Sequence, residues 1–162
     1  RFSVIRVPPE MMPEGRIQIV THHTPELVWQ PRYQRQPNGA TALTGVLICV
    51  KDPQEAATRF SRFVGVESVT SNNKWEMRLH EGRVVFIDDR HFRELFPHRE
   101  LPCTPYIAEV SLRTADLVAT RRFFDTAGIR NETPAAYALR VPGTEALGAS
   151  FLFHQLPEAG IF

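Results

Sequence analysis

The chain has 162 residues, which suits one domain with a single sizeable core. Its 43% apolar and 23% charged residues are typical of a globular protein, and its net charge of +1 argues against nucleic acid as a partner. No apolar run reaches the roughly 18 residues that span a bilayer, so we expect no membrane segment. Cys49 and Cys103 stand in unlike contexts, which predicts reduced thiols and a cytoplasmic location.

The first part of the chain, 1–40, reads as strands and loops. A strand is predicted over 2–7 and ends at Pro8, because proline cannot donate a backbone hydrogen bond to a sheet. Another strand is predicted over 15–22, where isoleucines occur two positions apart. A proline-rich stretch follows and closes with a turn at Asn38.

Residues 41–100 predict a strand, a helix and three more strands. The near-continuous apolar run at 43–51 is typical of a buried strand. Asp52 is a good helix N-cap, Pro53 fits the first helical position, and Gly65 supplies the stop. The three shorter strands are predicted over 66–71, 74–79 and 83–88.

Residues 101–162 predict the same order of elements. A strand over 106–113 precedes a helix that is capped by Thr114 or Asp116 and ended by Gly128. Three strands are then predicted around 129–133, 137–141 and 149–154.

These two parts form an internal repeat. Val46 and Val110 are separated by the same number of residues as Asp52 and Asp116. One helix for every four strands leaves one face of each sheet open. We therefore predict an α+β fold of paired βαβββ modules, with a curved cleft between the sheets of the two repeats.

Three stretches resemble the vicinal-oxygen-chelate superfamily, whose unit is the βαβββ module. The stretches 45–65 and 109–128 each resemble its opening strand, Asp-capped helix and glycine stop. The stretch 8–40 is similar to the linker of glyoxalase-like proteins that have four modules in two halves. The chain thus resembles the C-terminal part of such a protein, with 1–40 as the final strands and linker of a preceding module that is not in this chain.

The resemblance implies a divalent metal such as iron, manganese, nickel or zinc, held by the first and last strands of each module. Such an ion would act as a Lewis acid on a small-molecule substrate. Gly45 stands at the first-strand position of one module and cannot ligate. Glu109 stands at the matching position of the other module, and is the candidate catalytic residue as well as a candidate ligand. The last-strand candidates are Asp88 or Asp89, and His154 or Gln155.

Two further features have both a functional and a structural interpretation. His22 or His23 would be a metal ligand of the preceding module, since adjacent strand residues face opposite ways; alternatively they are a surface pair. Glu109 lies in an apolar strand and, if it is not a ligand, needs an arginine partner such as Arg113 or Arg140. Three other histidines are predicted to be solvated in polar turns or loops: His80, His91 and His98.

Two classes of function follow. One is a metal-dependent lyase, isomerase or dioxygenase-type enzyme, which Glu109 and His154 favour. The alternative is a non-catalytic small-molecule-binding protein, similar to drug-sequestering proteins of this fold, or a domain that supports a catalytic N-terminal half; Gly45 favours this class. The N-terminal strands also suggest a homo-oligomer or contact with an N-terminal domain.

Overall fold

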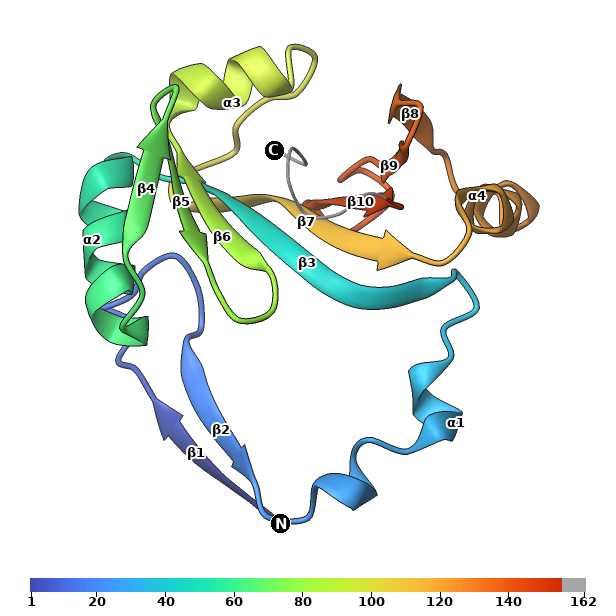
Figure 1. Ribbon diagram of the computed structural model, residues 1–162. Helices are drawn as coiled ribbons and strands as arrows, with labels where there is room; N and C mark the ends of the chain where they lie inside the picture. Colours follow the sequence, from blue (N-terminus) through green and yellow to red (C-terminus); the bar gives the residue numbers. More distant parts are fainter. Residues whose placement is uncertain (156–162) are drawn as a thin grey trace.

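The computed structural model describes residues 1–155, so the end of the second predicted module, 156–162, lies outside the described residues. Figure 1 shows one curved sheet flanked by helices, with a two-stranded hairpin extending from it. The eight strands run in the order β4-β5-β6-β3-β7-β10-β9-β8.

The first module follows its sequence signals closely. Asp52 caps helix α2 by accepting a hydrogen bond from the backbone N–H of Glu55 at 3.0 Å, and Gly65 ends the helix with a φ of 73°. The elements of this module are β3 (Ala40–Cys49), α2 (Pro53–Val64), β4 (Ser68–Ser71), β5 (Lys74–Arg78) and β6 (Arg83–Ile87).

The second module has the same order of elements. Of the two predicted caps, Asp116 is the one used: its carboxylate accepts from the backbone N–H groups of Val118 and Ala119. The elements are β7 (Tyr106–Thr114), α4 (Leu117–Thr126), β8 (Glu132–Ala135), β9 (Ala138–Val141) and β10 (Ser150–His154).

The two modules join edge to edge through their first strands. Strands β3 and β7 pair antiparallel, with Val46 directly opposite Val110, while β6 and β10 each pair in parallel with the first strand of their own module. The predicted α+β fold of paired βαβββ modules is confirmed. The expectation of two separate sheets is wrong, because the ladder between β3 and β7 merges both modules into one sheet. A cleft between the modules stays a prediction.

The two faces of the sheet are covered differently. Helices α2 and α4 pack on one face, where Phe60 meets Phe86 and Phe124 meets Phe153. The opposite face, here called the α3 face, is covered over the first module by helix α3 (Asp89–Leu95). Figure 1 shows α3 across the sheet from the hairpin.

Helix α3 lies where only turns and loops were expected. Asp88 caps it through the backbone N–H of His91 at 2.8 Å and also bonds the His91 ring at 2.7 Å. His91 is 9% exposed, so the prediction that it is solvated is wrong. Phe92 and Phe96 face the sheet beside it, with ring centroids 5.1 Å apart.

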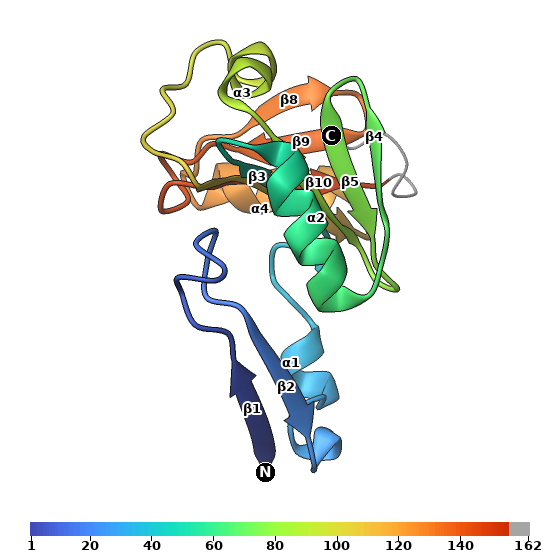
Figure 2. The same ribbon diagram turned by 90° about the vertical axis from the view of Figure 1, so that its left-hand side faces the viewer.

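The N-terminal segment stands apart from the sheet. Strands β1 (Phe2–Arg6) and β2 (Gln18–His22) form their own antiparallel hairpin, followed by the short helices η1 (Pro25–Leu27) and α1 (Pro31–Gln34). Figure 2 shows the hairpin and α1 extending away from the sheet on the side opposite α3. Within residues 1–155, no helix is long and apolar enough to cross a membrane.

Candidate functional site

The candidate site is the α3 face, where the resemblance places a metal. Residues paired directly across neighbouring strands lie side by side on one face, so this surface can be read as rows. One row is Val85, Leu47, Glu109 and Ser150. The next row toward the start of β3 is Arg83, Gly45, Ser111 and Leu152. The row on the other side is Ile87, Cys49 and Tyr106.

At the outer ends of these rows, Glu76 lies opposite Val85 and Glu132 lies opposite Arg140. Across the four central strands, only two residues of these rows are histidine, cysteine, aspartate or glutamate. They are Glu109, between Leu47 and Ser150, and Cys49, one row away. Burial, followed by the nearby Asp89 and Asp88 carboxylates, raises the pKa of the Cys49 thiol to about 11. This thiol is therefore protonated at neutral pH and is a poor ligand, since metals bind the thiolate.

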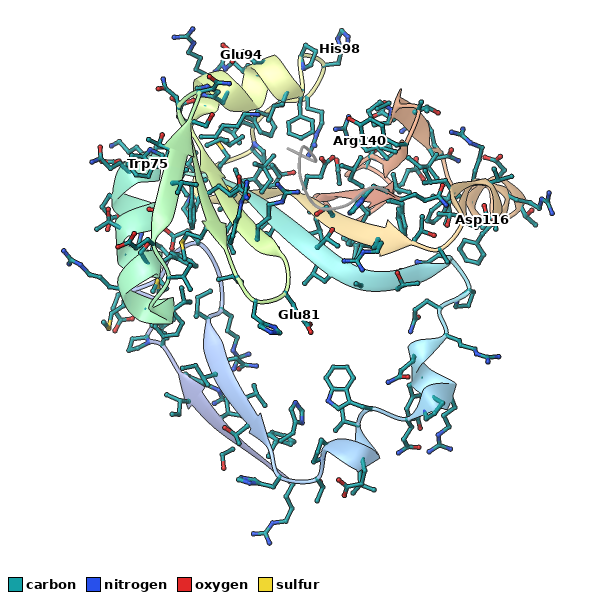
Figure 3. The ribbon with its side chains drawn as sticks, in the orientation of Figure 1. Trp75, Glu81, Glu94, His98, Asp116 and Arg140 are labelled. Atoms are coloured by element: carbon teal, nitrogen blue, oxygen red, sulfur yellow. The ribbon has the colours of Figure 1, made fainter. Side chains whose placement is uncertain are left out.

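Glu109 is engaged by Arg140 from β9. The Arg140 guanidinium donates to both carboxylate oxygens, with Nε–Oε2 at 2.5 Å and Nη2–Oε1 at 3.4 Å. Only 2% of the Glu109 side chain and 17% of the Arg140 side chain are exposed. Burial raises the pKa of Glu109 by more than the hydrogen bond and charge of Arg140 lower it. Figure 3 shows Arg140 on the α3 side of the sheet.

A second polar cluster joins the two modules. The hydroxyl of Thr44 lies 2.7 Å from His154 Nε2 and 3.0 Å from the Ser111 hydroxyl, and all three side chains are fully buried. Thr44 sits at an irregularity in the pairing of β3 with β7, between Leu43 and Gly45. Such a bulge turns a side chain out of the normal alternation, and here it brings Thr44 to the same face as Ser111.

Arg99, which follows α3, ties the helix to the second module. Its guanidinium donates to the Ser150 hydroxyl at 2.8 Å and to the Ala108 carbonyl at 3.3 Å. It also lies over the ring of Phe96, 4.4 Å from the centroid, and Arg140 lies over the same ring at 5.1 Å. Two arginines thus lie within cation–π distance of Phe96.

The structure does not bring the sequence-predicted ligands together. The backbone partner of Glu109 on β10 is Ser150, so His154 lies four positions further on, about 13 Å away along the strand. Asp88 follows β6 and caps α3. The remaining candidates lie elsewhere: Asp89 pairs with Arg93, His22 and His23 lie on or beside the hairpin, and Gln155 bonds the Ala115 carbonyl. Among residues 1–155, no three His, Cys, Asp or Glu side chains gather as a metal site would require.

Sequence reasoning missed three features of this face. Helix α3 has a readable signal, since Asp88 is an N-cap and the pairs Asp89–Arg93 and Arg90–Glu94 stand four residues apart. The role of Arg99 has no comparable signal in the sequence. Nor does the role of Thr44, which depends on a bulge that only the paired strands create.

Comparison with solved structures supports the same architecture. A methylmalonyl-CoA epimerase from Mycobacterium tuberculosis matches with a TM-score of 0.55 and 17% identity, covering 80% of this chain and 97% of that one. The Streptomyces coelicolor methylmalonyl-CoA epimerase, in complex with 2-nitronate-propionyl-CoA, matches with a TM-score of 0.52 and 9% identity over 72% of this chain and 97% of that one. No protein-family model matches the sequence, and no curated protein matches it.

The chain therefore has the vicinal-oxygen-chelate fold, built from two paired βαβββ modules. The divalent metal that this fold implies does not fit the described residues of the α3 face. Catalytic zinc, for example, needs about three protein ligands on one centre. Here Glu109 is bonded to Arg140, and its direct neighbours on either side are Leu47 and Ser150.

Proposed function

We propose that this chain is a non-catalytic, metal-independent module of glyoxalase-like fold that supports other parts of an assembly. The observation that carries the proposal is the composition of the three rows on the α3 face. Across the four central strands β6, β3, β7 and β10 they present one carboxyl group, which pairs with Arg140. The carboxyl groups at the outer ends of the rows, Glu76 and Glu132, pair with Arg83 and Arg140. A Lewis-acid site would need further donors beside Glu109.

The way this face is filled also supports the proposal. Phe92 is fully buried and Phe96 is 4% exposed, and both pack over Leu47 and Val85. Space that a substrate would need over the first module is therefore taken by side chains of the chain itself. A pocket for a small ligand is normally concave and open to solvent.

A second candidate function rests on the carboxyl group of Glu109. Its pKa is raised by burial, and a carboxyl group tuned toward neutral pH can act as a general acid or base. The similar solved structures are methylmalonyl-CoA epimerases. On this interpretation, Glu109 would move a proton at a carbon next to a thioester carbonyl, and Arg140 would have to release it first.

Metal titration tests the first proposal. We expect calorimetry of the full chain with Zn²⁺, Ni²⁺ or Mn²⁺ to show no binding that depends on Glu109. A Leu47→His/Ser150→His variant, whose fold is checked by circular dichroism, is the matched control, because it sets an imidazole on each side of that carboxylate. Tight binding by the wild type that is lost in Glu109→Gln would overturn the proposal.

Isotope exchange separates the two candidates. The full chain is incubated with methylmalonyl-CoA in deuterated water, and deuterium at the α-carbon is followed by mass spectrometry. The first proposal expects no exchange above the protein-free rate. Exchange by the wild type that is abolished in Glu109→Gln would establish the second candidate in its place.

A further inference from the structure

The hairpin of β1 and β2 extends away from the eight-stranded sheet and has two open edges (Figure 2). The backbone N–H of Val7 donates to the carbonyl of Ile17 at 3.1 Å. Counting along the register from this pair, the N–H groups of Val4, Gln18 and Val20 face outward, because residues of an antiparallel pair alternate between bonding their partner and pointing away from it. Among residues 1–155, β1 and β2 pair only with each other, so these outward groups have no partner strand.

Both faces of this hairpin carry an apolar pair as well. The cross-strand register puts Ile5 opposite Ile19 on one face and Val4 opposite Val20 on the other. Ile5 is 67% exposed and Ile19 is 48% exposed. Apolar residues on both faces are typical of strands that are covered on both sides, because a half-exposed sheet alternates apolar and polar residues. An isolated two-stranded hairpin is at best marginally stable in water.

The same chain shows twice what surrounds such a hairpin. In the first module the hairpin β5–β6 lies between β4 and β3, and in the second module the hairpin β9–β10 lies between β8 and β7. In each module the last strand pairs in parallel with the first strand, and the third strand pairs antiparallel with the second. One helix, α2 or α4, joins the two outer strands. A single strand–helix–strand unit therefore supplies both edges of each hairpin.

The connection that leaves β2 is built like the one that leaves β6. Residues 23–39 run from β2 to β3, the first strand of the first module, and residues 88–105 run from β6 to β7, the first strand of the second. Both stretches contain short helical segments and three prolines. The hairpin β1–β2 therefore stands before the first module as β5–β6 stands before the second.

These two connections also share a pair of aromatic residues four positions apart, which differ in burial. Phe92 and Phe96 are buried over β3 and β6, the first and last strands of the first module. Trp29 and Tyr33 are 64% and 58% exposed. Beside them β2 takes the place of a last strand, but among the described residues no first strand lies next to it. The surface that would bury this aromatic pair is therefore incomplete.

We propose that the hairpin completes a third βαβββ sheet, in which a strand–helix–strand unit of another domain flanks it on both edges. The first strand of that unit pairs in parallel with β2, its second strand pairs antiparallel with β1, and its helix covers one face. Residues 40–71 and 106–135 are such units, but each already flanks its own hairpin. A second copy of this chain therefore has no free unit to offer within its described residues. The inference rests on the proposed supporting role and names the part that the chain supports.

An extended chain tests the proposal. Residues 40–73, which comprise β3, α2, β4 and the turn that follows, are repeated directly ahead of Phe2 in the full chain, so that the added unit enters β1 as β4 enters β5. The control carries a glycine–serine stretch of equal length in their place. Amide hydrogen exchange of Val4 and Gln18 is followed by NMR in both chains and in the unextended chain. A second extension, residues 106–137, repeats the test with the unit of the other module.

We expect Val4 and Gln18 to exchange at least about tenfold more slowly in an extended chain than in the control or the unextended chain. Val20→Pro in that extended chain should return both amides to fast exchange. Proline removes an N–H that faces outward from β2 and leaves the inner hydrogen bonds of the hairpin in place.

Fast exchange of Val4 and Gln18 in both extended chains, while the amides of the eight-stranded sheet stay protected, would overturn the proposal. Strong protection of these two amides in the unextended chain would also overturn it, because the hairpin would then need no added unit. Metal binding at Glu109 would defeat the proposed function but leave these exchange rates unchanged, so the two failures are distinguishable.

Discussion

Replacing Arg140 by methionine tests whether the α3 face is a closed, ion-paired core. The change leaves the Glu109 carboxylate buried, with 2% of its side chain exposed, and without its cation. Removing one partner of such a buried pair costs about 3–5 kcal/mol. For a chain of this size, that corresponds to a fall in melting temperature of roughly 6–20 °C.

The assay is urea unfolding at pH 7, with Arg93→Met as the control, because the pair of Arg93 with Asp89 is exposed. The control should leave stability nearly unchanged. The Glu109→Leu/Arg140→Met double variant should recover most of the loss, since apolar groups of similar size can replace a buried pair. If Arg140→Met lowers the free energy of unfolding by less than about 1 kcal/mol, the pair is not buried as described, because solvent-exposed ion pairs contribute only that much.

Three further predictions concern helix α3, helix α2 and the carboxyl group of Glu109. Phe96→Ala should cost about 3–5 kcal/mol in urea unfolding, because it empties the space between α3 and the sheet; a change under about 1 kcal/mol would mean that α3 does not pack there. Asp52→Ala should cost about 1 kcal/mol by removing the cap of α2, and Asp52→Asn should restore it; equal losses in both would contradict the cap. Because the pKa of Glu109 is raised in the folded chain, the folded chain binds the carboxyl proton more tightly than the unfolded chain does. Protonated Glu109 therefore adds to the free energy of unfolding at pH values below its unfolded pKa. This contribution is lost as the pH rises through its folded pKa. Melting temperatures from acid to neutral pH should show this loss, and Glu109→Gln should flatten it; identical profiles for both chains would count against the assigned direction.

Much of the fold could be predicted because its signals are local. The caps at Asp52 and Asp116, the stop at Gly65 and the continuous apolar run of β3 each act within a few residues. The internal repeat predicts the same order of elements in both modules, and the pairing of Val46 with Val110 agrees with that repeat. The joining of the two modules into one sheet was missed, because pairing between distant strands leaves no local mark.

The candidate site was harder to predict because it depends on register. Glu109 was recognised as unusual in an apolar strand, and Arg140 was one of the two partners considered. Which residues of β10 lie beside Glu109 depends on the parallel pairing, which selects Ser150 and not His154. The assignment of 1–40 to a preceding module, and any metal role of His22 or His23, stay predictions.

The most direct test of the central claim is the metal content of the full chain, measured by plasma mass spectrometry on protein purified without chelators. We expect iron, manganese, nickel and zinc far below one ion per chain, with no difference between the wild type and Glu109→Gln. Close to one ion per chain in the wild type, lost in Glu109→Gln, would contradict it and restore the metal-dependent enzyme.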